Sequence, residues 1–131
     1  MKSLYVVLVA LALGLSPVAA LAQPDAELFA NPSRLTQTEG KNIYGAVCAG
    51  CHMPEGQGAV GAGRYPPLAN NEALEAAGYP IYVVIHGQKG MPPLGGLLND
   101  EQIAAVVEYI RTNFGNNYTD EVTVQEVTDS R

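Results

Sequence analysis

Residues 48–52 read Cys-Ala-Gly-Cys-His, and this stretch decides what the chain folds around. Cys48 and Cys51 are the only cysteines of the chain. Their spacing puts both thiols on one side of a helix end, beside the imidazole of His52. The small residues between them let a flat group lie close to the backbone. C-x-x-C-H is the attachment pattern of c-type haem, in which each thiol forms a thioether with a vinyl group and the histidine binds iron.

Other interpretations of this motif are weaker. A thioredoxin-like dithiol belongs near a βαβ pattern, which is absent here. A zinc site needs four ligands, and outside the motif the chain offers only His86, without a second paired motif. A disulfide would leave His52 without a role. We therefore predict one covalent haem c, bound through Cys48 and Cys51.

The second axial ligand is predicted to be Met91, in Gly90-Met91-Pro92-Pro93. Glycine allows the backbone to approach closely, prolines stiffen the segment, and Met/His is a common axial pair in cytochromes. Met53 directly follows His52 and cannot reach the opposite face of the same iron. His86 is the alternative, giving a bis-histidine iron, although its simpler role is to end a helix, where a cation is favourable.

The sequence predicts short helices joined by two long glycine- and proline-rich loops, 54–67 and 87–98, which should wrap around something because they cannot pack a core of their own. The expected helices are 37–49 with Thr36 as N-cap and Glu39 in a capping box, 72–77 capped by Asn71, 80–86 beginning at Pro80 and ended by Gly87, and about 100–114 capped by Asn99. The expected inner faces are Gly40, Ile43, Tyr44 and Val47 in the first helix, and Ile103, Val106, Val107 and Ile110 in the last.

The first 22 residues are predicted to be a secretory signal peptide. Lys2 precedes an apolar stretch, 4–15, and Ala20-Leu21-Ala22 provides a cleavage site. The alternative is an uncleaved membrane anchor. We expect four segments: signal peptide 1–22, extended arm 23–35, haem domain 36–115 and acidic tail 116–131, in which Val122, Val124 and Val127 suggest contact with the surface. After cleavage we expect a soluble periplasmic protein without stable membrane insertion.

Composition narrows the class further. A length of 131 residues suits one small domain, and 47% hydrophobic residues argue against disorder. A net charge of −6 argues against nucleic-acid binding, which uses a basic surface. Loss of Lys2 with the signal peptide would make the charge one unit more negative.

Between Thr36 and Phe114 the chain resembles the class I c-type cytochromes, specifically small bacterial monohaem cytochromes associated with dehydrogenases. The family pattern is present as Gly40, Tyr44, Cys48, Cys51 and His52. The resemblance implies an all-α fold with short helices and long loops around one haem. It also implies that Gly40 lets the first and last helices cross closely, against the stripe of Val106, Val107 and Ile110 with Tyr109 nearby.

The resemblance assigns further roles after the attachment motif. In Pro66-Pro67-Leu68, the carbonyl of Pro67 is expected to accept the free N–H of His52, and Leu68 to pack on the haem. Arg64 and Tyr65 are expected either to meet a haem propionate or to be ordinary solvated residues. The chain departs from the family in having no tryptophan, and from its basic mitochondrial members in being acidic.

The predicted function is electron transfer by a non-enzymatic carrier whose iron cycles between Fe(III) and Fe(II). The expected donor is a periplasmic dehydrogenase, and the acceptor a terminal oxidase or another cytochrome. Docking is expected at 91–94 and the Cys48–Cys51 edge, with partners that present a basic patch. A free carrier should be a monomer. The alternatives are a permanently bound subunit of a quinoprotein or flavoprotein dehydrogenase, and a haem enzyme or gas sensor with an open sixth position, which Met91 argues against.

Overall fold

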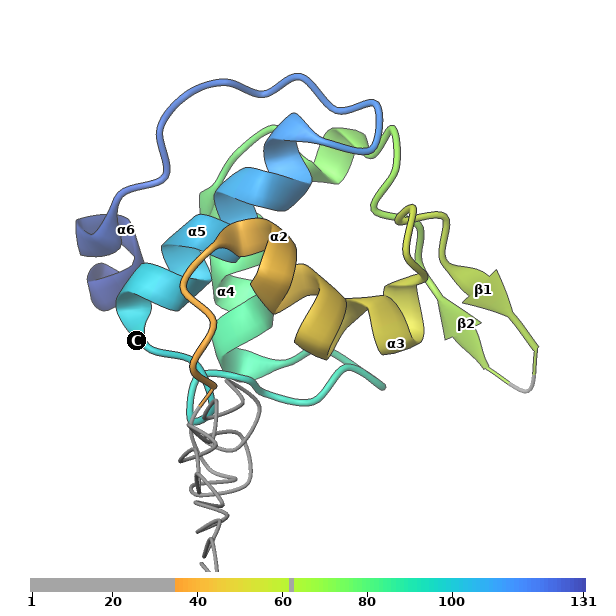
Figure 1. Ribbon diagram of the computed structural model, residues 1–131, viewed down its shortest axis with the longest axis horizontal. Coiled ribbons are helices and arrows are strands. Elements are labelled where there is room, and N and C mark those ends of the chain that lie inside the picture. The colour runs from red at the N-terminus through yellow and green to blue at the C-terminus, as the bar shows by residue number, and fades with distance from the viewer. Residues whose placement is uncertain (1–34, 62) are drawn as a thin grey trace, which may run out of the picture.

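The computed structural model describes residues 35–61 and 63–131 (Figure 1). Its elements, in chain order, are α2 (Gly40–Ile43), the π-helical η1 (Tyr44–Cys48), α3 (Ala49–His52), β1 (Ala59–Val60), β2 (Arg64–Tyr65), the 3-10 helix η2 (Glu72–Leu74), α4 (Gly78–His86), α5 (Asp100–Thr112) and α6 (Val124–Asp129). The predicted signal peptide and most of the arm lie outside the described residues. Within the described ranges, no helix combines the length and apolar character needed to span a bilayer.

The all-α prediction is confirmed, with one small addition. β1 and β2 form an antiparallel hairpin inside the first predicted loop, pairing Ala59 with Tyr65 and Val60 with Arg64. The hairpin projects beyond α3 at one end of the molecule, and α6 lies at the opposite end (Figure 1). The helices therefore form the core, and α3, which carries Cys51 and His52, lies next to the hairpin.

The first helical run begins later and ends later than predicted. The capping box at Thr36 and Glu39 is wrong, because α2 starts at Gly40 with Glu39 as an extended N-cap that makes no side-chain cap bond. The reason is tertiary: the side-chain amide of Gln102 donates to the carbonyls of Leu35 and Gln37, at 2.8 and 2.7 Å, in the segment where the helix was expected to start. At the other end, helical structure continues from α2 through η1 and α3 to His52.

Gly40 is where α2 and α5 cross most closely. A Cβ added there would overlap the carbonyl oxygen of Ala105 and lie 2.7 Å from the Cβ of Tyr109. The predicted crossing is therefore confirmed, but its nearest partners are Ala105 and Tyr109 rather than the apolar stripe. That stripe is buried as predicted: Ile103, Val106, Val107 and Ile110. The helix crossing is reinforced by tilted ring contacts of Tyr44 with Tyr109 and Phe114.

The later helices follow their local signals with shifted limits. Asn99 caps α5 in a full capping box with Gln102, as the sequence indicated for the cap, but α5 ends at Thr112. Asn71 accepts a hydrogen bond from the Ala73 N–H as predicted, yet the helix it caps is a single 3-10 turn. α4 begins at Gly78, two residues before Pro80, and ends at His86, followed by Gly87 as the C-cap, whose φ of 72° favours glycine.

The acidic tail contains a helix that was not predicted. Thr123 and Glu126 form a complete capping box at the start of α6. Val122 and Val127 are buried in the same core as α5, whereas Val124 is exposed. The Thr-x-x-Glu pattern was the available local signal. The fully buried Arg111 holds the tail by donating to the Asp120 carboxylate and backbone carbonyl, and to the carbonyls of Leu74 and Glu75.

Candidate functional site

The attachment cysteines lie on the last turns of the first helical run and form no disulfide with each other. Cys51 is exposed, and Cys48 is half-buried. Burial, with a smaller contribution from Cys51, raises the pKa of the Cys48 thiol to about 11. A redox-active dithiol normally has a lowered thiol pKa, so this environment does not resemble one. Thioether attachment therefore fits these side chains better than dithiol redox chemistry.

His52 is oriented to present one ring nitrogen to a metal. Its Nδ1 lies 3.0 Å from the backbone oxygen of Pro66. Because a carbonyl can only accept, Nδ1 carries the proton, and in the neutral ring the lone pair is on Nε2. Such a bond sets ring orientation and raises the basicity of a ligating imidazole. The buried His52 therefore fits the proximal ligand of a haem.

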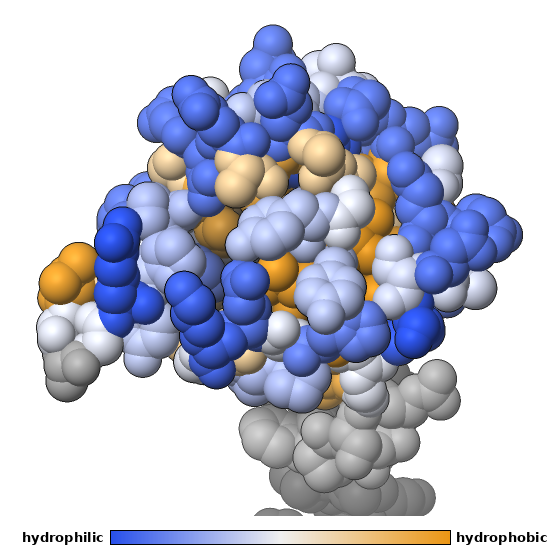
Figure 2. All heavy atoms as spheres, turned by 180° about the vertical axis from the view of Figure 1, so that it is seen from behind, coloured by the Kyte–Doolittle hydropathy of each residue, from blue (hydrophilic) through white to orange (hydrophobic). Residues whose placement is uncertain are grey.

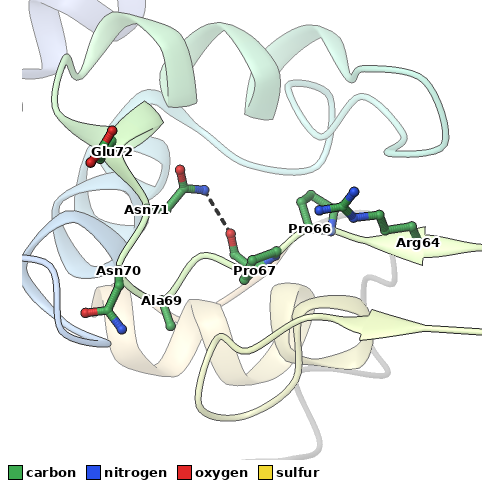
Figure 3. Close-up of a pocket in the computed structure, with 7 residues that line it drawn as sticks. All are labelled: Arg64, Pro66, Pro67, Ala69, Asn70, Asn71 and Glu72. Carbon is green, nitrogen blue, oxygen red and sulfur yellow. Dashed lines mark hydrogen bonds between the residues drawn. The ribbon is translucent and has the colours of Figure 1, made fainter.

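The acceptor for His52 is Pro66, which corrects the expected Pro67. The carbonyl of Pro67 instead accepts the side-chain amide of Asn71 at 2.8 Å (Figure 3). The hairpin explains why Pro66, rather than Pro67, lies at the His52 ring. Gly58 donates to the carbonyl of His52 at 3.0 Å, and a side chain at Gly58 would collide with the carbonyl of Tyr65. Because the chain returns this close to His52, the carbonyl of Pro66 reaches the His52 ring, and the carbonyl of Pro67 does not.

Hydrogen bonds to Gly56 and Asn116 fix the segment that follows the hairpin, residues 66–71. The N–H groups of Leu68 and Ala69 both donate to the carbonyl of Gly56, at 2.7 and 2.9 Å. The buried side chain of Asn116 donates to the carbonyls of Leu68 and Ile110 and accepts from the N–H of Asn71. Leu68 is half-buried and packs against the core. Asn116 was missed by sequence reasoning, since nothing local marks an asparagine beyond a helix as a brace.

Met91 lies in a tight reversal of the second long loop. Gln88 and Met91 exchange two backbone hydrogen bonds of 3.0 Å each. A Cβ at Gly87 would lie 2.6 Å from the Met91 carbonyl oxygen, so glycine is needed where the loop doubles back. The side chain of Met91 is half-buried and packs against the core. Tyr79 adds a bond of 3.0 Å from its hydroxyl to the side chain of Gln88.

The alternative ligand, His86, has other partners in the structure. Its Nε2 lies 2.8 Å from the backbone oxygen of Ser130, so this nitrogen carries a proton. Its ring also packs on that of Tyr82 with centroids 4.6 Å apart. Binding iron through Nε2 would require the bond to Ser130 to break.

Arg64 and Tyr65 form β2, and both are exposed. Arg64 lines an open cavity of about 410 Å³ together with residues on the segment that follows: Pro66, Pro67, Ala69, Asn70, Asn71 and Glu72 (Figure 3). Tyr65 is not part of that lining.

One helix face was overlooked at the sequence level. α4 buries Pro80, Ile81, Val84 and Ile85, while Tyr79 and Tyr82 are 47% and 55% exposed. Two aromatic side chains three residues apart, opposite a buried stripe, were the available signal.

Apolar side chains are also uncovered at the centre of the face seen in Figure 2, surrounded by hydrophilic residues. Uncovered apolar surface of this kind suits a flat apolar group such as haem.

A helix-borne C-x-x-C-H motif, an oriented histidine and an all-α fold with long loops define a class I monohaem c-type cytochrome, with haem c attached through Cys48 and Cys51. The chain belongs to the family described as cytochrome C oxidase, cbb3-type, subunit III, which it matches over residues 36–110.

Similar proteins include both separate cytochromes and subunits of larger enzymes. Cytochrome c-552 of Thermus thermophilus is 40% identical over 98 residues, covering 63% of this chain and 64% of the relative. The cytochrome c subunit of alcohol dehydrogenase (quinone) from Gluconacetobacter polyoxogenes is 34% identical over 105 residues, 70% of this chain and 22% of that subunit. Cytochrome c6 of Parathermosynechococcus lividus is 38% identical over 76 residues, 54% of this chain and 83% of the relative. The chain thus spans under two thirds of the first relative and about a fifth of the second.

Proposed function

We propose that this protein is a periplasmic one-electron carrier with His52 and Met91 as the axial ligands of its haem. It accepts electrons from a periplasmic dehydrogenase and passes them toward a terminal oxidase. When bound, the haem supplies an iron that cycles between Fe(III) and Fe(II). The observation that carries the proposal is the Nδ1–H bond from His52 to Pro66, which leaves the Nε2 lone pair for iron.

The loop around Met91 supports its role as the sulfur ligand. The paired backbone hydrogen bonds between Gln88 and Met91 restrict the conformation of the loop. The close contact between Gly87 and the Met91 carbonyl limits the other conformations that the loop can adopt. A methionine sulfur raises the reduction potential of a cytochrome iron. Retaining both ligands in both oxidation states keeps structural rearrangement small. Met91 also has the advantage over His86 that no described hydrogen bond must break to free it.

Pro66, Leu68 and Arg64 are proposed to complete the surroundings of the haem, Pro66 through the carbonyl that accepts from His52. Leu68 offers a half-buried apolar side chain beside the Pro66 carbonyl that orients His52. Arg64 offers an exposed guanidinium in the same segment, suited to pairing with a propionate. For Tyr65 we retain the same propionate contact as a weaker proposal, because it lies outside the cavity that Arg64 lines.

The proposed docking face consists of residues 91–94 and the exposed edge at Cys51. Cys51 is exposed, as are Pro92 and Pro93. Val60, on the neighbouring hairpin, is 85% exposed and adds an apolar contact point. Small interfaces of this kind suit short-lived encounters between redox partners. The net charge of −6 favours partners with a basic patch and a rate that falls with salt.

A second candidate is a permanently bound cytochrome subunit of a quinoprotein or flavoprotein dehydrogenase. It is favoured by the similarity to the cytochrome c subunit of alcohol dehydrogenase (quinone). Size-exclusion chromatography of native material separates the two: a free carrier elutes as a monomer, and a subunit elutes with its enzyme. The signal peptide over 1–22 and export to the periplasm remain part of the proposal and are tested by N-terminal sequencing of the mature protein.

The axial ligand is tested by replacing Met91 with alanine in the holoprotein. We expect loss of the ferric methionine–iron charge-transfer band and a lower midpoint potential. Met53→Leu is the matched control, because Met53 is also half-buried but directly follows His52 and so cannot reach the opposite face of the same iron. The proposal fails if the Met91→Ala protein retains the band. Stopped-flow reduction by candidate dehydrogenases at increasing salt then tests the direction and charge of docking.

A further inference from the structure

The end of the tail is hydrogen-bonded to both limits of the loop that carries Met91. Before the loop, His86 donates from Nε2 to the carbonyl of Ser130 at 2.8 Å. After it, the guanidinium of Arg131 donates to the carbonyls of Gly95 and Leu98 at 2.7 and 3.0 Å. Two adjacent tail residues therefore bridge positions that the loop separates along the chain.

The tail is itself anchored to rigid structure. Val127 is fully buried in the core, which fixes α6 against the helices below it. Asp100, the first residue of α5, accepts from the hydroxyl of Thr128 at 2.7 Å and pairs with Nε of Arg131. The guanidinium is thus oriented by a carboxylate while its two outer nitrogens reach the loop. A planar fork of this kind holds more than one acceptor at fixed geometry.

The loop has its own attachment on the side of α4, which the tail complements. The N–H groups of Leu94 and Gly95 donate to the carbonyls of Val84 and Ile85, at 2.9 and 3.2 Å. Gly95 is therefore bonded to α4 through its N–H and to Arg131 through its carbonyl. A Cβ at Gly95 would lie 3.0 Å from the carbonyl oxygen of Ile85 and 3.3 Å from Nη1 of Arg131, so the fit is tight on both sides.

We infer that Ser130 and Arg131 are positioning residues for the sulfur of Met91, acting by holding the loop between His86 and Leu98 closed. This inference rests on the proposed ligation by Met91. The tail does not touch the iron. It lowers the fraction of time that the loop is open, and an open loop lets an external ligand replace the sulfur.

The test uses ferric holoprotein and imidazole as the competing ligand. Arg131→Ala removes both carbonyl bonds and the pair with Asp100, and we expect imidazole affinity to rise about tenfold. Amide exchange at Met91 and Leu94 should accelerate in parallel. Arg131→Lys keeps the charge but cannot bridge both carbonyls, so it should give an intermediate rise. If the Arg131→Ala protein does not fold, the Arg131→Lys protein provides the test on its own.

Two controls separate loop positioning from general loosening. Gln125→Ala alters an exposed residue of α6 whose side chain bonds only Asp129 among the described residues, and it should leave imidazole affinity unchanged. Ile43→Val loosens the core at a fully buried position of α2 and should lower the melting temperature without changing imidazole affinity. The inference is overturned if neither Arg131 variant changes imidazole affinity, or if Ile43→Val raises imidazole affinity as much as Arg131→Ala does.

Failure of this inference differs from failure of the proposed ligation. If the wild-type ferric protein lacks the methionine–iron band, Met91 is not the ligand, and the positioning role of Ser130 and Arg131 is overturned as well. If the band is present but neither Arg131 variant changes imidazole affinity, Met91 remains the ligand and only the positioning role is rejected.

Discussion

Replacing Gly40 with alanine should force α2 and α5 apart. The new methyl group would overlap the carbonyl oxygen of Ala105 and lie 2.7 Å from the Cβ of Tyr109. Neither obstacle is the end of a flexible side chain, so the helices must shift. Overpacking of this kind costs roughly 1–3 kcal/mol, and backbone contact puts Gly40 near the upper end. Better helix propensity returns less than about 1 kcal/mol at the first helical position.

The expected net loss is about 2 kcal/mol, which corresponds to a fall of roughly 8–16 °C in melting temperature for a domain of this size. Thermal unfolding of the holoprotein followed by circular dichroism measures it. Gly45→Ala is the matched control: Gly45 is an exposed glycine of the same helical run, and a Cβ there meets nothing within 4 Å. It should stabilise the protein by about 0.5–1 kcal/mol. Equal stability of the Gly40→Ala and Gly45→Ala proteins would refute the close-crossing argument.

Two further predictions concern pH. Burial raises the pKa of Tyr44 to about 12 from its ordinary 10.0, so the folded protein keeps a proton that the unfolded chain loses, and stability should fall as pH rises between these values. Tyr44→Phe should flatten that slope in urea titrations and, at neutral pH, cost about 1 kcal/mol for the lost bond to the Met53 carbonyl; an unchanged slope would contradict this. In acid, the hydrogen bond from Arg111 lowers the pKa of Asp120, and that from Thr128, followed by Arg131, lowers the pKa of Asp100. Their stabilisation is complete above their ordinary pKa of 3.8 and is lost as pH falls through the lowered values. Asp120→Asn should therefore reduce the acid dependence of urea unfolding, and an identical pH profile would contradict the prediction.

Equivalent local patterns had different outcomes in this chain. Asn99 and Thr123 both form capping boxes, whereas Thr36, with Glu39 three residues later, does not. Local sequence does not distinguish them. The difference comes from Gln102, whose side chain binds the carbonyls of Leu35 and Gln37 from a helix far along the chain. Capping signals therefore located helix starts only where no distant partner competed for the backbone.

The same limit applies around the haem site. The attachment motif, the oriented histidine and a proline carbonyl as its acceptor could be expected from sequence and resemblance. Which proline supplied the carbonyl could not, because the choice of Pro66 depends on the two-residue strands of the hairpin. The roles of Asn116 and Arg111 were also out of reach, since each joins backbone groups from segments remote in sequence.

By itself, the sequence determined the cofactor and the class, because covalent attachment depends on residue types at contiguous positions: Cys48, Cys51 and His52. The resemblance also indicated that Gly40 lies at a helix crossing, and the sequence indicated that Gly87 ends a helix, but only the tertiary contacts show that no larger residue fits at either position. Only the tertiary structure decided that the tail forms a helix packed on the core, that His86 binds Ser130, and that Arg131 reaches the Met91 loop. These contacts join groups far apart along the chain, and their partners are set by how the helices pack rather than by any local pattern.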